Sequence, residues 1–332
     1  MLTPRENYLR ALRKEPYEYT PIASLDIGRA GGVGWLETGP PGGGLDGFGV
    51  PWVNPDSGAG APLPEPGNFI LTDVTQWKEK VTIPDVDAID WDKVVESMPP
   101  VDREQLAIEA SCRCGVFERL GALMGFEEAL LAMAEEPEAV NDLFEAITTY
   151  KIKYAEKLAK YIKPDIFTNF DDIATEHNPF ISYKTYNELI KPHHKRLNNA
   201  CWNLGIIPLQ HTCGRAEDYI EGYIETNAAA WTLVQPRNDI VSALKKYGDK
   251  ICLIGGYNAN GPPGFITATE EMIKDEVRRC FDTYAPYKSY IFSQGAVVFS
   301  SQQAQFREKF LQYVRAACLE FRKAEFEKLG IN

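Results

Sequence analysis

The chain has 332 residues, of which 44% are hydrophobic and 25% are charged, and its net charge is -12 with a pI of about 5.0. This is the composition of a soluble globular protein, and the length suits one α/β barrel with insertions. An acidic chain without a cluster of Lys and Arg is not expected to bind nucleic acid. The sequence has no apolar stretch long enough to span a bilayer, and its charged amphipathic start is not expected to act as a signal peptide. Its seven cysteines form an odd set, so we expect reduced thiols in a cytoplasmic protein.

Short apolar runs alternate with amphipathic segments along most of the chain. Strands are predicted at Ile22–Leu25, Leu106–Ala110, Asp165–Phe170, Ile206–Gln210, Ala228–Val234, Ile251–Gly255 and Ser289–Phe292. Helices are predicted at Pro137–Ile162, Ser182–Asn203, Arg215–Glu225, Asp239–Tyr247, Thr269–Tyr284 and Ser301–Leu329. Strands that alternate with helices indicate a parallel sheet with crossover helices. With an eighth strand in the N-terminal third, the pattern favours an α/β fold of the closed (β/α)8 TIM barrel type, and a doubly wound open sheet is the alternative.

The segment from Asp26 to Asn68 is irregular and contains ten glycines between Gly28 and Gly49. No Gly-Lys-Ser/Thr follows these glycines, which argues against a phosphate-binding loop. Aromatic residues are interleaved with the glycines, unlike in a disordered linker. Because a long loop inside a compact domain is usually functional, we interpret it as an excursion from the first strand that folds over the barrel mouth. A decorated surface loop is the alternative.

The tetrapeptide His211-Thr212-Cys213-Gly214 directly follows the apolar run Gly205–Gln210. A buried strand that delivers an imidazole and a thiol two residues apart presents both on one side of its end. Neutral imidazole and thiolate are ligands that zinc prefers, and a catalytic zinc needs three protein ligands and an open position. The alternative is a histidine and a cysteine packed in the core.

Two aspartates, Asp171 and Asp172, follow the strand predicted at Asp165–Phe170. In a barrel they lie at the C-terminal face, where catalytic residues gather. Adjacent residues at a strand end point apart, so only one of them need enter the mouth as a metal ligand, substrate anchor or general acid. The alternative is that one of them caps the following turn. Glu176 and His177 lie further along this loop, where exposure to solvent is expected.

Other polar residues have weaker patterns. His193 and His194 are adjacent on a predicted helix, where side chains point about 100° apart and cannot bind one ion together, so we expect them on a solvated face. Cys112 and Cys114 lack the second cysteine pair of a structural zinc site and are interpreted as mouth-lining or packed residues. Tyr257 follows two glycines at a strand end, where it could stack on an aromatic ring.

Five motifs occur in an order and spacing that carry a family resemblance: residues 43–52 (Gly-Gly-Leu-Asp-Gly-Phe-Gly-Val-Pro-Trp), 170–173 (Phe-Asp-Asp-Ile), 211–214, 235–240 (Gln-Pro-Arg-Asn-Asp-Ile) and 246–250 (Lys-Tyr-Gly-Asp-Lys). Over nearly its whole length the chain resembles the uroporphyrinogen decarboxylase-like superfamily, and most strongly its corrinoid-linked methyltransferase branch. The resemblance implies one (β/α)8 domain over residues 1–332, with residues 1–100 as an N-terminal extension and loop, and a site at the C-terminal mouth.

Two departures from the family pattern reduce the number of activities that the resemblance allows. True decarboxylases of the superfamily carry Arg-Gln-Ala-Gly-Arg near the N-terminus, whereas residues 24–30 here read Ser-Leu-Asp-Ile-Gly-Arg-Ala. Only Arg29 and Arg113 remain to bind a tetracarboxylate, so porphyrinogen decarboxylation is disfavoured. Thiol-methylating members hold zinc with His-x-Cys and a later Cys, but residues 294–298 contain no cysteine. This leaves a carboxylate from the 171–176 loop as third ligand, or no tightly held metal.

The pattern at residues 43–52 resembles the first methyltransferases of anaerobic O-demethylation. Such proteins move a methyl group from a methoxylated aromatic to the cob(I)alamin of a separate corrinoid protein, and this chain has no Asp-x-His-x-x-Gly cobalamin-binding sequence. The resemblance thus implies a corrinoid protein and a small aromatic methyl donor as partners, and zinc as a possible cofactor. The resemblance does not decide whether the protein forms a homodimer. The alternatives are a methylcorrinoid:thiol methyltransferase, a decarboxylase, and a non-catalytic barrel that binds a small aromatic or a tetrapyrrole.

Roles for individual residues follow from these interpretations. Catalytic roles are predicted for Asp171, Asp172 and His211. The predicted zinc ligands are His211, Cys213 and Glu176. Asn169 is predicted to bind the substrate, together with an aromatic slot built from Trp35, Trp52, Tyr257 and Phe299.

Overall fold

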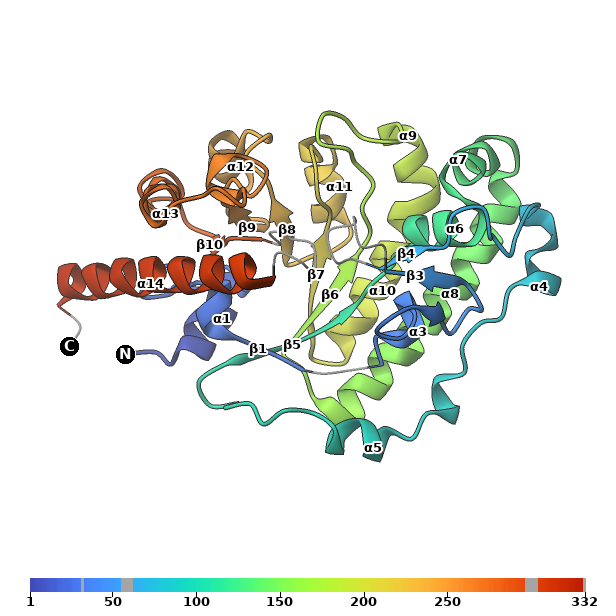
Figure 1. The fold of residues 1–332 in the computed structure, drawn as a ribbon, viewed down its shortest axis with the longest axis horizontal. Helices are drawn as coiled ribbons and strands as arrows, with labels where there is room; N and C mark the ends of the chain where they lie inside the picture. Colours follow the sequence, from blue (N-terminus) through green and yellow to red (C-terminus); the bar gives the residue numbers. More distant parts are fainter. Residues whose placement is uncertain (31–32, 55–61, 296–303, 331–332) are drawn as a thin grey trace.

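The computed structural model describes residues 1–30, 33–54, 62–295 and 304–330. Its central feature is a sheet of seven parallel strands that lie side by side in chain order (Figure 1). These strands are β1 (Ile27–Arg29), β5 (Ala107–Cys112), β6 (Ile166–Phe170), β7 (Ile207–His211), β8 (Ala230–Val234), β9 (Cys252–Gly256) and β10 (Tyr290–Ser293). Ile22 forms a further parallel bridge to Phe292 of β10, which closes the ring through the N-terminal segment. The fold is therefore of the predicted (β/α)8 barrel type, but in the described residues the bridge at Ile22 stands in place of the expected eighth strand.

Helices surround the sheet and fill one end of it. The outer helices are α6 (Val116–Met124), α7 (Phe126–Glu135), α8 (Pro137–Lys157), α9 (Tyr183–Thr185), α10 (Lys191–Asn203), α11 (Ile220–Glu225), α12 (Ile240–Tyr247), α13 (Glu270–Tyr284) and α14 (Ala304–Leu329). Two π-helical turns, η3 (Leu158–Ile162) and η4 (Tyr186–Ile190), extend α8 and precede α10. The N-terminal helix α1 (Pro4–Arg13) packs Tyr8, Leu9 and Leu12 among the inward-facing residues of the strands. Among the described residues, no helix is long and apolar enough to cross a bilayer.

The predicted strand Ile22–Leu25 is wrong except for the bridge at Ile22. The chain instead forms a helical turn, α2 (Ala23–Asp26), and β1 begins only at Ile27. The cause is Asp26, whose carboxylate accepts the backbone N–H of Ile22 at 2.8 Å and receives two hydrogen bonds from Arg322 of α14 at 2.7 Å each. A contact with the other end of the chain thus sets this local conformation. The other predicted strands are correct to within two residues at each end.

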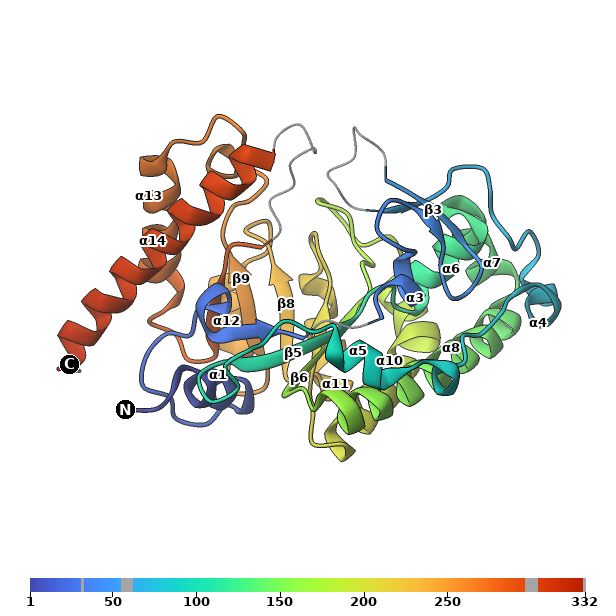
Figure 2. The same ribbon diagram turned by 60° about the horizontal axis from the view of Figure 1, so that its bottom comes forward.

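The glycine-rich excursion is a small packed unit. It contains α3 (Trp35–Thr38) and an antiparallel sheet of β2 (Gly44–Leu45), β3 (Pro51–Val53) and β4 (Leu63–Pro64). Phe48, Val50 and Trp52 are buried in the main core. Figure 2 shows that the unit lies at one side of the rim, beside α6 and α7. The connection to β5 continues through short helices η1 (Val74–Gln76), α4 (Trp77–Lys80), η2 (Val86–Ala88) and α5 (Trp91–Glu96).

A buried charge network attaches this unit to the barrel. Arg119 of α6 forms an ion pair with Asp46 at 2.5 Å and donates to the carbonyl oxygen of Glu37 at 2.7 Å. Lys151 of α8 lies 3.3 Å from the Glu37 carboxylate, and the indole N–H of Trp52 donates to Asp46 at 2.8 Å. All four charged side chains are almost completely buried. Because two cations meet two carboxylates, the network balances its charge, as burial requires.

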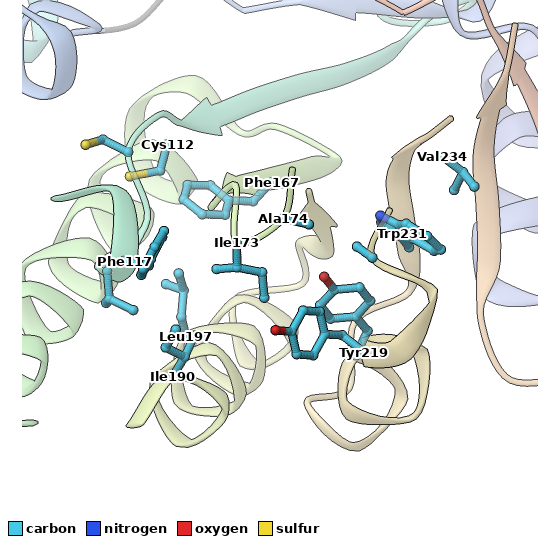
Figure 3. Close-up of a cluster of buried hydrophobic side chains, with 14 of the residues drawn as sticks. Cys112, Phe117, Phe167, Ile173, Ala174, Ile190, Leu197, Tyr219, Trp231 and Val234 are labelled. Carbon is cyan, nitrogen blue, oxygen red and sulfur yellow. The ribbon is translucent and has the colours of Figure 1, made fainter. Parts of the chain in front are cut away.

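The core behind the mouth lies between the sheet and helices α6, α10 and α11 (Figure 3). Its buried side chains include Phe117, Phe167, Ile173, Ile190, Leu197, Tyr219 and Trp231. The indole N–H of Trp231, on β8, donates to the carbonyl oxygen of Thr212 at 3.0 Å. The core thus supports the turn that follows β7 from behind.

Candidate metal and catalytic site at the barrel mouth

Asp172, His211 and Cys213 meet at the C-terminal ends of β6 and β7. The Sγ atom of Cys213 lies 3.3 Å from Nε2 of His211, and this Nε2 lies 3.8 Å from Oδ1 of Asp172. One ligand atom from each residue falls within 4.8 Å of the other two. The three side chains are partly buried. In the described part of the chain, this is the one place where three potential metal ligands lie this close together.

The turn after β7 is held in one conformation. The backbone N–H of Cys213 donates to Oδ1 of Asp172 at 2.6 Å, and the hydroxyl of Thr212 donates to the carbonyl oxygen of Asp171 at 2.9 Å. Gly214 has φ +82, and a Cβ atom there would lie 2.2 Å from the carbonyl oxygen of Thr175. A side chain at this position would therefore force the two loops apart. The His-x-Cys-Gly pattern thus reflects a real steric requirement.

Without a bound cation, their surroundings keep the imidazole of His211 and the thiol of Cys213 uncharged. The imidazole of His211 stacks on Phe170 with ring centroids 4.1 Å apart. Burial lowers the pKa of His211, although Asp172 opposes this effect, so the ring is neutral at pH 7. Burial, with Asp172 and Glu118 nearby, raises the pKa of the Cys213 thiol well above its usual value. A divalent cation would reverse this by stabilising the thiolate.

Zinc fits this donor set. Imidazole nitrogen, thiolate sulfur and carboxylate oxygen are the three ligand types that zinc binds in proteins, and three protein ligands leave a position open for a reacting group. The set supplies one donor of each type, and Asp172 takes the place of the missing second cysteine. A carboxylate in place of a thiolate makes the site harder and its hold on zinc weaker.

Asp171 points away from this group and has a structural role. Its carboxylate accepts the backbone N–H groups of Phe117 at 3.3 Å and Glu118 at 3.0 Å, and it pairs with Nε2 of His194 at 2.8 Å. It is completely buried, and a Cβ atom on Gly115 would overlap it. The structure therefore does not bring Asp171 to the predicted catalytic position. Its carboxylate instead stabilises the N-terminus of α6.

The prediction that His193 and His194 lie on a solvated face is wrong. Both rings are buried. His194 pairs with Asp171, and Nε2 of His193 lies 3.0 Å from Oδ1 of Asn141 on α8. The two rings point to different partners, as their spacing on the helix predicts. They pack α10 onto its neighbours and do not contribute to the mouth.

Comparisons with known proteins place the chain in a family. Residues 115–317 match the family described as Uroporphyrinogen decarboxylase (URO-D), which is more than half of the chain. The chain belongs to the URO-D family. A search of curated proteins gave no match. Among solved structures, a protein described as "methyltransferase from Methanosarcina mazei" superposes with a TM-score of 0.64 at 12% identity, covering 97% of this chain and 100% of that one. At this identity the likeness shows the fold alone, and it confirms the URO-D-type barrel.

The structure places the remaining predicted site residues of this URO-D protein in several different surroundings. Glu176 is not part of the ligand group, because its Oε1 accepts two hydrogen bonds from Arg237 at 2.9 and 2.7 Å. Asn169 is buried and donates to Gln210 of β7 at 3.3 Å. Phe299 lies outside the described residues. The third ligand offered by the structure is thus Asp172, and the predicted assignment of Glu176 needs this correction.

Among the predicted aromatic residues that the structure describes, only Trp35 borders open space. Trp35 is 46% exposed and lines a cavity of about 700 Å³ between the excursion and the ends of β1 and β5, together with Arg113. Trp52 is bonded to Asp46 in the buried network. Tyr257 is buried, and its hydroxyl donates to the carbonyl oxygen of Pro263 at 2.8 Å. The structure therefore does not assemble a slot from Trp52 and Tyr257.

Glu118 is a candidate functional residue that the sequence analysis missed. It lies in the first turn of α6, where its carboxylate accepts the backbone N–H of Gly115 at 3.4 Å. Burial raises its pKa to about 8, and the carboxylates of Asp172 and Asp171 add to this effect. At pH 7 it is mainly protonated. The signal in the sequence was a Glu three residues after a Gly that follows a buried strand, the spacing at which a first-turn carboxylate returns to the helix start.

Proposed function

We propose that this URO-D family protein is a methyltransferase that transfers the methyl group of a methoxylated aromatic to the cob(I)alamin of a separate corrinoid protein. The observation that carries the proposal is the Asp172–His211–Cys213 group at the barrel mouth. Cleavage of an aryl methyl ether releases a phenolate, which is a poor leaving group. The reaction therefore needs a Lewis acid or a proton donor at the ether oxygen. Asp172, His211 and Cys213 are ligands that can hold a Lewis-acidic metal ion.

Two further observations support a methyl transfer over a decarboxylation. A tetracarboxylate would need several arginines converging on the mouth. Arg29 is 88% exposed and already lies 3.6 Å from Glu109, Arg113 lines the cavity beside Trp35, and Arg237 lines a different cavity, so the three do not share one site. The structural neighbour from Methanosarcina mazei is itself described as a methyltransferase. Both observations favour the same class of reaction.

In the proposed reaction, residues of this chain hold the Lewis acid and keep the loop at the site in position. His211, Cys213 and Asp172 would hold zinc, and when bound it would act as a Lewis acid on the ether oxygen. Asp172 also fixes the turn through the N–H of Cys213, and Phe170 orients the ring of His211. The methyl carbon accepts the electron pair of cobalt(I) on the partner protein. The C–O bond breaks, its electron pair stays on oxygen, and the phenolate takes up a proton.

We propose Glu118 as the source of that proton. A carboxyl group is an effective general acid when its pKa lies near the working pH, and the pKa of Glu118 is raised to about 8. The first cause of this shift is burial; the charge of Asp172 adds to it, and a cation bound to Asp172 would remove that second contribution. The carboxyl group of Glu118 then donates its proton to the phenolate, and the resulting carboxylate takes up a new proton from solvent.

This role predicts a pH dependence. The acid form of Glu118 predominates below its pKa, which burial holds above the usual value of a carboxyl group, so methyl transfer is expected to decline as the pH rises through that pKa. Glu118→Gln is expected to lower the rate about 100-fold and to remove this decline. The measurement is the pH profile of methyl transfer for both proteins, with the exposed Glu127→Gln as the control. A Glu118→Gln profile that keeps the wild-type decline would assign the ionisation to another group.

The proposed function itself is tested with two substrates. Purified protein is incubated with cob(I)alamin and a methoxylated benzene, and methylcobalamin is followed by absorbance. A parallel reaction contains uroporphyrinogen, and carbon dioxide release is measured. We expect methylcobalamin and the phenol in the first reaction and no carbon dioxide in the second. Decarboxylation of uroporphyrinogen without demethylation of any methoxyarene would replace the proposal with the decarboxylase alternative.

A further inference from the structure

A second, smaller cavity lies at the same end of the barrel. Its volume is about 300 Å³, at the lower end of the range for small-molecule sites. It lies between the loops that follow β6, β8 and β9, the end of a barrel where substrates bind. Its lining includes the polar residues Glu176, Gln235, Arg237, Asn258 and Asn260. The role proposed above does not use these residues.

The cavity is fixed in position relative to Cys213. The backbone N–H of Gly214 donates to Oε1 of Gln235 at 2.9 Å. Asn238 donates to the carbonyl oxygen of Gly214 at 2.9 Å and accepts the N–H of Ala216 at 3.0 Å. Because the turn that carries Cys213 is bonded directly to the wall of the cavity, a ligand in the cavity has a set position relative to the metal ligands.

Arg237 is the cationic group of this cavity. Its Nε and Nη2 atoms both donate to Oε1 of Glu176, and both side chains are more than 40% exposed. An exposed ion pair of this kind contributes little to stability, so Arg237 is free to exchange or share its partner. Within the described residues, Nη1 of Arg237 has no hydrogen-bond partner. The guanidinium therefore keeps donor capacity for a second carboxylate, the anion that its geometry binds best.

Side-chain amides complete the polar wall. The backbone N–H of Asn258 donates to Glu276 of α13 at 2.8 Å, which fixes the start of its loop. A Cβ atom on Gly261 would lie 2.3 Å from Nδ2 of Asn258. The absence of a side chain at residue 261 therefore lets the Asn258 amide lie against the backbone. Amide N–H groups can donate to carboxylate or phenol oxygens.

We propose that this cavity binds a carboxylate carried by the methyl donor, so that the substrate is a methoxylated aromatic acid. This inference rests on the proposed function. Arg237 forms the charge-assisted contact, the amide of Asn258 or Asn260 donates a further hydrogen bond, and Glu176 orients the guanidinium. The carboxylate end of the donor then lies beside the Cys213 turn, and its ether oxygen faces the metal ligands.

The test compares three methyl donors of similar shape and different charge. These are methoxybenzoate, methoxybenzamide and methoxybenzylamine, each with cob(I)alamin. We expect wild-type kcat/KM to be highest for the benzoate. Arg237→Gln should lower kcat/KM for the benzoate by about 10- to 100-fold, the loss typical of one charge-assisted hydrogen bond, and change the amide less than twofold. Arg278→Gln, which removes an exposed arginine on α13, is the matched control. Equal losses for all three donors, or a wild-type preference for the amine, would overturn the carboxylate site.

A binding measurement separates this inference from the proposed function. Calorimetry with hydroxybenzoate, which carries the carboxylate but no methyl group, needs no turnover. We expect wild type to bind it, Arg237→Gln to bind at least tenfold more weakly, and Gly261→Ala to bind more weakly because it displaces Asn258. If this pattern holds and no donor is demethylated, the carboxylate site stands and the proposed reaction fails. If Arg237→Gln binds hydroxybenzoate as tightly as wild type, the site is overturned whatever the turnover.

Discussion

His211→Ala and Cys213→Ser are each expected to lower methyl transfer by about 100- to 1000-fold, the scale of losing one electrostatic stabiliser of a transition state. In the proposed zinc site each change removes one of only three ligands, and two ligands would not retain zinc on dilution. Zinc content after purification should therefore fall together with the rate. Asp172→Asn should behave similarly, because an amide is a weaker ligand than a carboxylate.

His177→Ala is the matched control for His211→Ala. His177 is exposed in the same group of loops, so its loss should leave zinc content and rate within about twofold of wild type. The contradicting outcome is a wild-type protein that remains fully active after chelation and contains no metal. His211 and Asp172 would then act as hydrogen-bonding or acidic groups, and zinc would have no part in the reaction.

Arg119→Met is expected to destabilise the fold by about 3–5 kcal/mol. It removes one of two cations from the buried network, so that Asp46 loses its ion-pair partner and Glu37 keeps Lys151. The aliphatic Met fills the volume but leaves an uncompensated carboxylate in the core. The measurement is the free energy of unfolding in urea at pH 7.

The control for this change is Arg278→Met on α13. Arg278 forms an exposed ion pair with Asp275 at 2.7 Å, and the loss of such a pair costs about 0–1 kcal/mol. The two variants remove the same chemical group in different surroundings. Equal destabilisation by both would mean that the network does not attach the glycine-rich excursion to the barrel.

The barrel could be predicted from the sequence because its signal is local. Each buried parallel strand is a short apolar run, the crossover helices have their own periodicity, and some of them begin at a capping residue. Thr269 and Asp239 indeed cap α13 and α12 through their side chains. The segment Ile22–Leu25 was mispredicted because its conformation depends on Arg322, a partner at the far end of the chain. The helix and strand propensities of residues 22–25 carry no information about that distant contact.

The candidate site could be predicted only in part. His211 and Cys213 were found because their spacing and the preceding strand are visible in the sequence. The choice between Asp171 and Asp172 requires the side to which β6 presents each residue, and the sequence does not contain this. His194 was placed in solvent because its partner, Asp171, lies on another element. Trp52 was assigned to the mouth by residue type and Tyr257 by its position after a strand, whereas packing directs both side chains into the core.

The most direct test of the proposed methyl transfer is to follow the methyl group itself. A donor with a ¹³C-labelled methoxy group is mixed with the protein and one equivalent of cob(I)alamin, and the products are analysed by NMR. The account predicts that the label moves to methylcobalamin with wild type, at the same rate as the phenol is released, and that His211→Ala transfers little of it. Label that stays in the donor, or phenol released without labelled methylcobalamin, would contradict it.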